Sequence, residues 1–485
     1  MNEPGPLRDQ LRSLCAGVLA DLGADEQRGR VEAVARRLAE PTLRIAVGGR
    51  LNAGKSTLVN ALLGSRLAAT GSTECTRVVT WFRHGERTTV EVQPRSGPAY
   101  HIAPTPDGRI PADLGRPAAE LRSVTLCTPH PALTAYTLVD TPGLDALSGL
   151  DDMSMAALRE CDALVFVMPH PGSREQEALE SFTAATSAAG LSLANAVGVL
   201  SQIDRLGTGE GDPWPQARRV AGRYAGRLRA NVSDVIPVVG LLAQTAALGE
   251  LDPGDADLLR AVAAAVPAPA RRARLLSADA FIDDSGLPGD AAGRRRLLAL
   301  LGRYGITAAL ALYDEGGYPV EVVTRRLGEL AGLAAVRSVI EDRFVPAADI
   351  LRTAGAMAAL DLVAWSDPGR AAAMAGLRQR LAELRAHPTM RFVAITAAVA
   401  DLRSLGLDDQ AERDLLDLAR GTNDAQRVGL DADAARPAVA AAADERIARW
   451  RRRGTGGLGN TARRAQVSRI AWEAFEAILY ADRGA

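Results

Sequence analysis

GGRLNAGKST, residues 48–57, contains Lys55, and the chain of 485 residues has no second lysine. Every other long basic side chain is an arginine. If arginine is used wherever it can serve, Lys55 marks a position where arginine does not serve. The apolar run LRIAVGG at 43–49 leads into the glycines and KSTLVNALLG at 55–64 follows them. This order predicts a buried strand, a glycine-rich turn and a helix.

The turn has the pattern of a phosphate-binding loop, G-x-x-x-x-G-K-[ST]. Its glycines let backbone N–H groups close around phosphate oxygens. The ammonium of Lys55 is a compact charge that can reach the β- and γ-phosphates, whereas a guanidinium is too broad for the same ring. The predicted nucleotide contacts here are Gly49, Arg50, Leu51, Asn52, Ala53, Gly54, Lys55, Ser56 and Thr57. A chance match on a glycine-rich turn is the alternative.

A second stretch, LVDTPG at 138–143, contains the end of a predicted strand, whose last residue is Asp140. A carboxylate at this place can orient Mg²⁺ through water. The Gly143 N–H can then meet the γ-phosphate and respond to its loss. The stretch therefore predicts a part of the site that distinguishes the triphosphate from the diphosphate.

The third predicted metal ligand comes from ECTRVVT at 74–80, between these two stretches. Thr76 is the threonine that we expect to close over Mg²⁺, with Thr73 and Thr80 as competitors. An ordinary strand residue is the alternative for Thr76. The predicted metal ligands are Ser56, Thr76 and Asp140.

The base is predicted from LSQID at 200–204, where another strand ends before Asp204. One carboxylate accepts hydrogen bonds from the ring N–H and the exocyclic amine of guanine, and adenine has no such donor pair. This predicts GTP and GDP as ligands and the exclusion of ATP. GTPases generally have a lysine two positions earlier, where this chain has Gln202. The backbone at Gly240, after VIPVVG, is a weaker candidate for the guanine oxygen, and a capping or surface aspartate is the alternative for Asp204.

The order of patterns predicts the fold class. Strand-like runs alternate with helical runs from 43 to about 240, which implies a mostly parallel sheet with helices on both faces. The two runs within 77–93 are expected to add an antiparallel pair. From about 268 the pattern is almost entirely helical. We expect an α/β GTPase domain of the phosphate-binding-loop class at 42–267, a helical segment at 1–41 and an extended helical region at 268–485.

The quoted motifs, in this order, resemble those of bacterial dynamin-like GTPases, and most closely the isoniazid-inducible group of actinobacteria. The resemblance is specific over about 43–205. It implies that 1–41 and 268–485 form a helical neck and stalk. It also implies GTP hydrolysis with Mg²⁺, dimerisation of the GTPase domains or pairing with a paralogue, and coupling to membrane remodelling or tethering.

The resemblance also implies roles in catalysis. In several related GTPases an Asn or Ser at the position of Asn52 helps to bind K⁺ or Na⁺ between the phosphates, and a loop-capping residue is the alternative. Arg50 could act as an arginine finger, or it could be an ordinary exposed arginine. The predicted catalytic residues are Lys55, Asn52, Thr76 and Gly143.

Charge and hydropathy restrict the partners. The net charge of −1 gives no overall attraction to nucleic acid, and none is expected as a partner. We expect a cytoplasmic protein without a signal sequence or an apolar run of about 18 residues. Residues 445–469 carry eight arginines and one glutamate around Trp450. They could bind anionic headgroups at the inner face of the cell membrane, or they could pair with acidic residues of the stalk.

Two other functions are compatible with these motifs. GTPases of the Era and tRNA-modification type also carry an asparagine in this loop and act on RNA or the ribosome. A nucleotide-switched scaffold with low turnover would tolerate Gln202 and the absence of the Ser-Ala pair that GTPases usually carry after the last strand. Turnover that rises with protein concentration would separate dynamin-type dimerisation from a scaffold.

Overall fold

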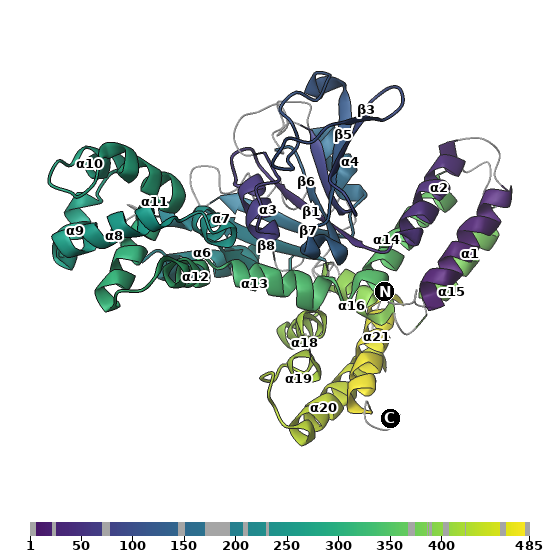
Figure 1. Ribbon diagram of the computed structural model, residues 1–485. Helices are drawn as coiled ribbons and strands as arrows, with labels where there is room; N and C mark the ends of the chain where they lie inside the picture. The colour runs from purple at the N-terminus through teal and green to yellow at the C-terminus, as the bar shows by residue number, and fades with distance from the viewer. Residues whose placement is uncertain are drawn as a thin grey trace.

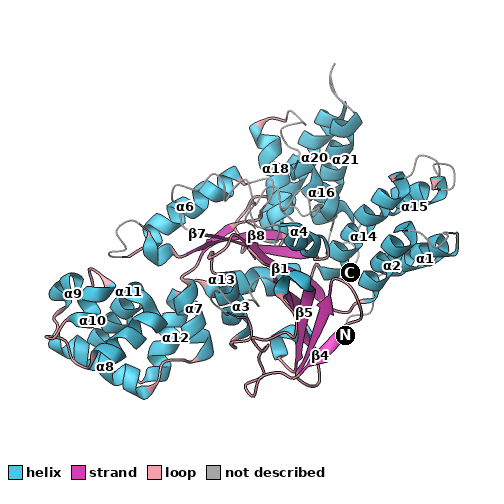
Figure 2. Ribbon diagram, turned by 90° about the horizontal axis from the view of Figure 1, so that it is seen from above, coloured by secondary structure: helices cyan, strands magenta, loops and turns pink. Residues whose placement is uncertain are grey.

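The computed structural model describes residues 6–21, 26–69, 78–143, 151–169, 195–206, 212–228, 232–366, 374–385, 387, 390–400, 407–421, 423–455 and 462–480. Within them, nine strands form one sheet in the order β4-β3-β5-β2-β6-β1-β7-β8-β9. The strands are β1 (Leu43–Gly49), β2 (Val79–His84), β3 (Thr89–Pro94), β4 (Tyr100–Ile102), β5 (Leu121–Thr128), β6 (Tyr136–Asp140), β7 (Ala163–Pro169), β8 (Ala196–Ser201) and β9 (Val235–Pro237). Helices cover the sheet, as Figures 1 and 2 show.

The parallel half of the sheet positions the candidate site. Strands β6, β1, β7, β8 and β9 are all parallel, and the residues of β6 and β8 are buried throughout. A strand that is covered on both faces has a continuous apolar sequence, and this is why these runs could be recognised. Because the strands are parallel, their carboxyl ends meet at one edge, where ligands bind in open α/β sheets.

The other half of the sheet is mixed. β2 pairs antiparallel with β6, with Trp81 opposite Val139, and parallel with β5. β3 pairs antiparallel with both β4 and β5. The antiparallel pair that we predicted from the two runs within 77–93 is therefore wrong, because β5 lies between β2 and β3. A short connection makes two strands neighbours only if no later strand enters between them.

The largest apolar core extends beyond the predicted α/β region. It runs from Leu43 to Leu351 and joins the sheet to the helices beside it. These helices are α3 (Lys55–Leu63), α4 (Asp151–Arg159), α6 (Trp214–Arg227), α7 (Gly240–Leu248), α8 (Pro253–Ala265), α9 (Ala268–Arg274), α10 (Ala278–Asp283), α11 (Ala291–Glu315), α12 (Val320–Leu330), α13 (Leu333–Ser338) and the π-helix η5 (Val339–Phe344). The domain boundary at 267 stays a prediction, and this packing leads us to propose that 268–351 belongs with the GTPase domain.

A helical bundle, which we call the neck, combines the two N-terminal helices with two helices from residues 348–385. It contains α1 (Pro6–Asp21), α2 (Glu26–Ala39), α14 (Ala348–Trp365) and α15 (Ala375–Arg385), which lie side by side in Figure 1. Leu11, Leu38, Leu360 and Leu381 are completely buried between these helices. The apolar residues of α1 and α2 recur every three or four positions, so each helix buries one face.

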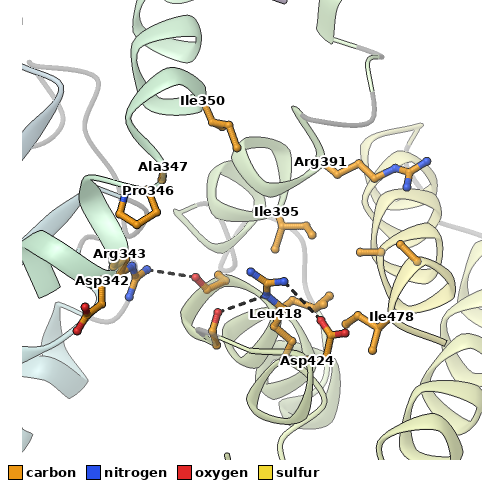
Figure 3. Close-up of a pocket in the computed structure, with 15 residues that line it drawn as sticks. Asp342, Arg343, Pro346, Ala347, Ile350, Arg391, Ile395, Leu418, Asp424 and Ile478 are labelled. Carbon is orange, nitrogen blue, oxygen red and sulfur yellow. Dashed lines mark hydrogen bonds and ion pairs between the residues drawn. The ribbon is translucent and has the colours of Figure 1, made fainter. Parts of the chain in front are cut away.

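The remaining helices form a separate bundle, which we call the trunk. It contains α16 (Arg391–Ala400), α18 (Asp409–Arg420), α19 (Asp424–Arg427), α20 (Arg436–Thr455) and α21 (Ala462–Leu479) around Trp450 and Phe475. A cavity of about 540 Å³ lies where the trunk meets η5 and the start of α14. At its edge Arg343 of η5 donates a hydrogen bond to the carbonyl oxygen of Ala419 at 3.2 Å (Figure 3).

The basic run of α20 is paired within the trunk. Trp450 is fully buried, and its indole Nε1 donates to Oδ2 of Asp414 at 3.0 Å. Nη1 of Arg449 lies 2.8 Å from the same oxygen, and Arg446 also pairs with Asp414. Trp450 therefore lies inside the trunk and has no exposed face for a membrane interface. The alternative, in which these arginines pair with acidic residues of the stalk, describes Arg446 and Arg449.

Among the described residues, α11 is the one helix with the length and composition of a membrane span, and half of that window is buried. Its backbone breaks at Gly302, where φ is 62° and ψ is −179°. Leu301, Ile306 and Leu310 belong to the largest core. These are properties of a kinked core helix.

Candidate functional site

The loop between β1 and α3 depends on backbone conformations that favour glycine. Gly49 has φ 141°, and a Cβ there would lie 2.3 Å from the carbonyl oxygen of Val167 in the neighbouring strand. Gly54 has φ 91°, and Asn52 has φ 60°. Asparagine is one of the few other residues that tolerate this region. The loop curls around Lys55, whose buried ammonium donates to the carbonyl oxygen of Arg50 at 2.9 Å.

Lys55 and Ser56 begin α3, so the first N–H groups of this helix face the loop. The Ser56 hydroxyl donates to Oδ2 of Asp140 at 2.7 Å. Burial raises the pKa of Asp140 to about 6, although the Lys55 charge and the Ser56 hydrogen bond both act to lower it. Phosphate oxygens would add further negative charge beside the Asp140 carboxylate, so their binding here would require an added cation.

The residues present fit Mg²⁺. Oδ1 of Asp140 is buried and has no hydrogen-bond partner among the described residues. A buried carboxylate oxygen without a partner, on the carboxylate that also accepts from the Ser56 hydroxyl, is suited to a hard cation or its water. The described residues contain no cluster of three or more His, Cys, Asp or Glu that could hold a metal. A bound Mg²⁺ would thus need phosphate oxygens and water for its other ligands.

Gly143 lies against the loop. A Cβ at Gly143 would be 2.6 Å from the backbone nitrogen of Leu51, so a larger residue would displace one of the two segments. Thr141 fixes the same stretch, because its hydroxyl donates to the carbonyl oxygen of Val47 at 3.1 Å. Leu51 itself is 57% exposed. The structure thus brings the predicted phosphate-responsive stretch directly onto the predicted phosphate loop.

The end of β8 is tied to the loop by two side chains. The Ser201 hydroxyl lies 2.7 Å from the carbonyl oxygen of Ala53, to which it donates. Gln202 has φ 56°, and its side-chain amide donates to the carbonyl oxygen of Asn52 at 2.8 Å. Glutamine therefore supplies a hydrogen-bond donor here. Reasoning from the sequence missed Ser201, because a serine that ends a strand carries no signal for a distant carbonyl.

A cavity of about 230 Å³ opens beside the loop. Its lining includes Gly54, Thr57, Gln202, Asp204 and Gly240. These residues come from three separate stretches of the sequence, each at the carboxyl end of a strand or the start of the following helix. The structure brings the predicted phosphate and base contacts to one cavity, and their roles stay predictions.

Of the three threonines considered as the third metal ligand, the structure describes Thr80. Thr76 and its competitor Thr73 lie outside the described residues. The other competitor, Thr80, is buried in β2, and its hydroxyl donates to the carbonyl oxygen of Val78 at 3.3 Å. Asn60 was not predicted from the sequence, and its buried amide bonds both the N–H and the carbonyl oxygen of Ala68, at 2.8 and 3.0 Å. Asn60 thereby anchors the chain that follows α3.

A strand, a glycine loop around one lysine, an aspartate beside the loop serine and a second aspartate beside a neighbouring cavity define the site of a phosphate-binding-loop GTPase. Residues 45–194 match the model of the dynamin family. The chain is 34% identical over 471 residues to the isoniazid-induced protein IniC of Mycobacterium tuberculosis, a match that covers 92% of this chain and 93% of IniC. The chain belongs to the dynamin family, whose members are GTPases.

Two further relatives match shorter parts of the chain. The isoniazid-induced protein IniA of Mycobacterium tuberculosis is 31% identical over 147 residues, which cover 28% of this chain and 23% of IniA. A bacterial dynamin-like protein of Nostoc punctiforme is 24% identical over 171 residues, which cover 31% of this chain and 25% of that protein. The resemblance stated from the motifs is confirmed, and the Era-type alternative gains no support from these relatives.

Proposed function

We propose that this protein binds GTP in the cavity beside Lys55 and hydrolyses it with Mg²⁺, and that hydrolysis moves the helical neck in membrane remodelling or tethering. The observation that supports this most is the convergence of Lys55, Asp140 and Asp204 at one edge of the sheet. Family membership adds the GTPase activity. The membrane role comes from the dynamin resemblance alone.

On this proposal the chain positions the phosphates through its own donors. Lys55 leaves the Arg50 carbonyl for the β- and γ-phosphates, and the N–H groups at the start of α3 bind the same oxygens. Ser56, Asp140 and Thr76 would hold Mg²⁺, which neutralises charge on the phosphates when it is bound. Gly143 donates its N–H to the γ-phosphate, and it is close to the loop already.

The base would be read by Asp204, with the Gly240 backbone at the guanine oxygen. Gln202 would hold the phosphate loop in a fixed position relative to the base, because it joins the Asn52 carbonyl to the stretch that carries Asp204. Asn52 has an exposed side chain beside the phosphates. We therefore assign it the K⁺ or Na⁺ that other members of the class place here, and the cation would offset phosphate charge in the transition state.

Self-association is part of the proposal. Leu51 is a large apolar residue that is 57% exposed in the phosphate loop, and a second GTPase domain over the site would bury it. This partner could be a second copy or a paralogue, since the chain resembles both IniC and IniA. We also propose a peripheral contact with a membrane, and we expect no nucleic acid as a partner.

Turnover should depend on protein concentration and on the monovalent cation. If a second GTPase domain completes the site, GTP hydrolysis per molecule rises over a dilution series from nanomolar to micromolar protein. If Asn52 holds a cation, hydrolysis in K⁺ exceeds hydrolysis in choline at equal ionic strength. The series is measured by phosphate release, with and without anionic liposomes. Constant turnover per molecule in the dilution series would contradict the dimer, and equal rates in the two salts would contradict the cation.

A further inference from the structure

Arg352 of α14 is an arginine that is 99% buried, and three of its five N–H donors lie on nitrogens without a partner among the described residues. Its side chain is 1% exposed, and Nη1 donates to Oδ1 of Asp349 at 3.3 Å. The same oxygen already accepts from Nη1 of Arg8 at 3.2 Å. Nε and Nη2 of Arg352 have no partner among the described residues. These two nitrogens form the edge of a guanidinium that grips a carboxylate with two parallel hydrogen bonds.

Asp162 is a buried carboxylate of the GTPase domain at the same junction. It precedes β7 directly, and its side chain is completely buried. Oδ1 accepts from Nε and Nη2 of Arg37 in α2, at 3.1 and 2.8 Å. Arg37 thus holds Asp162 with the same guanidinium edge that stays unpartnered on Arg352. Arg37 also reaches α14, because its Nη2 lies 3.7 Å from the place of a Cβ on Gly355.

The charges at this junction support Asp162 as the carboxylate that Arg352 lacks. Burial lowers the pKa of Arg352, and Asp162 is the first charge that opposes this lowering. Glu40 is occupied, since it pairs with the Arg44 side chain. Asp349 is shared with Arg8. Arg37, which holds Asp162, lies beside Gly355, one helical turn after Arg352 on α14, and this placement makes Asp162 the candidate carboxylate for both arginines.

Asp162 is also linked to the nucleotide loop. Its Oδ2 accepts from the backbone N–H of Arg44 at 2.9 Å, and its own N–H donates to the Arg44 carbonyl at 2.8 Å. Arg44 lies in β1, the strand that ends in the phosphate loop, and Asp162 precedes β7, which pairs with β1. A displacement of β1 against β7 would therefore reach Asp162 directly.

We propose that Asp162 is the shared anchor of a junction with two positions, held by Arg37 of α2 in one and by Arg352 of α14 in the other. In the arrangement described here Arg37 has the carboxylate and Arg352 keeps two buried donors without a partner. A shift of α14 against β7 gives the carboxylate to Arg352 and leaves Arg37, which is 15% exposed, to water. Buried unsatisfied donors are unfavourable, so the two positions can be close in free energy. That nucleotide drives the exchange rests on the proposed function, whereas the exchange itself does not.

The two positions can be distinguished by a distance between spin labels. One label is placed at His101→Cys in β4 and the other at Leu362→Cys in α14, where the native side chains are 68% and 70% exposed. Cys75→Ser and Cys127→Ser remove competing thiols, and the buried Cys15 and Cys161 are kept. Distance distributions are recorded by pulsed electron paramagnetic resonance, first without nucleotide and then with a non-hydrolysable GTP analogue and Mg²⁺.

Without nucleotide, Arg37→Met should move the population toward a second distance, because Arg352 then holds Asp162 alone. We expect a shift of about tenfold or more in the ratio of the two populations, the size expected for two charge-assisted hydrogen bonds. The double variant Arg37→Met/Arg352→Met should lose this shift, since neither arginine then holds the carboxylate. Arg12→Met, an exposed arginine of α1 whose side chain is 49% exposed, is the matched control and should behave as the parent.

Two results would overturn the proposal. One is a distribution for Arg37→Met equal to that of its double variant, which would mean that Arg352 never takes Asp162. The other is a parent that shows two populations together with a single Arg352→Met variant that keeps both in the parent's ratio, which would mean that Arg352 does not hold the second position. If the parent ignores the GTP analogue but Arg37→Met shifts as expected, the exchange stands and the coupling to nucleotide in the proposed function fails.

Discussion

Lys55→Ala should reduce GTP turnover by about 100-fold or more, the usual effect of removing one charged or hydrogen-bonding group from a site that stabilises a transition state. In the present structure the ammonium is buried and already turned to the inside of the loop by the Arg50 carbonyl. Alanine leaves the loop's backbone intact but removes the charge that would meet the phosphates. The measurement is phosphate release at saturating GTP, together with GTP binding by fluorescence of a labelled analogue.

Lys55→Arg is the sharper variant, because it keeps the charge. A guanidinium has the wrong breadth for a loop that closes around a single ammonium, so we expect arginine to restore little of the turnover. Lys55 is the single lysine and all remaining long basic residues are arginines, so this variant tests directly why arginine is not used here. Turnover in Lys55→Arg equal to that of the parent protein would contradict the explanation for the single lysine.

Gly49→Ala should lower the stability of the GTPase domain by about 3 kcal/mol or more, because strain and an unrelieved clash act together. The new Cβ would lie 2.3 Å from the carbonyl oxygen of Val167, and both atoms belong to paired strands that cannot move apart cheaply. The backbone angle φ of 141° is also one that residues with a Cβ rarely adopt. The effect is measured as the shift in thermal unfolding midpoint without nucleotide.

Gly54→Ala is the matched control for this prediction. Gly54 lies in the same loop with φ 91°, but a Cβ there would meet nothing within 4 Å. Only the left-handed backbone strain remains, which amounts to about 1–2 kcal/mol. If Gly54→Ala lowers the midpoint as much as Gly49→Ala does, the close approach of Gly49 to β7 is not what makes glycine necessary.

Much of the candidate site could be predicted because its residues follow the ends of buried strands. The apolar runs that end at Gly49, Asp140 and Ser201 are strands β1, β6 and β8, and the carboxyl ends of parallel strands meet at one edge. The order of strands along the sequence was less informative about which strands pair. β5 separates β2 from β3, and only the three-dimensional sheet order contains that information.

The contacts that hold the site together were beyond the sequence for a different reason. Ser201, Gln202 and Asn60 all bond backbone oxygens of distant residues, and any polar side chain could have done so. Trp450 among arginines suggested a membrane surface, but Asp414 lies below it and accepts its N–H. A local run of charge does not indicate which elements will pack against it.

The proposed function requires guanine nucleotide in the cavity between Lys55 and Asp204. Equilibrium dialysis of radiolabelled GTP against the purified protein with Mg²⁺ tests it most directly, with unlabelled GTP and ATP as competitors. We predict saturable retention of one GTP per chain, which excess GTP displaces and excess ATP does not, and its loss in Lys55→Ala. No retention of GTP, or displacement by ATP as effective as that by GTP, would contradict the account.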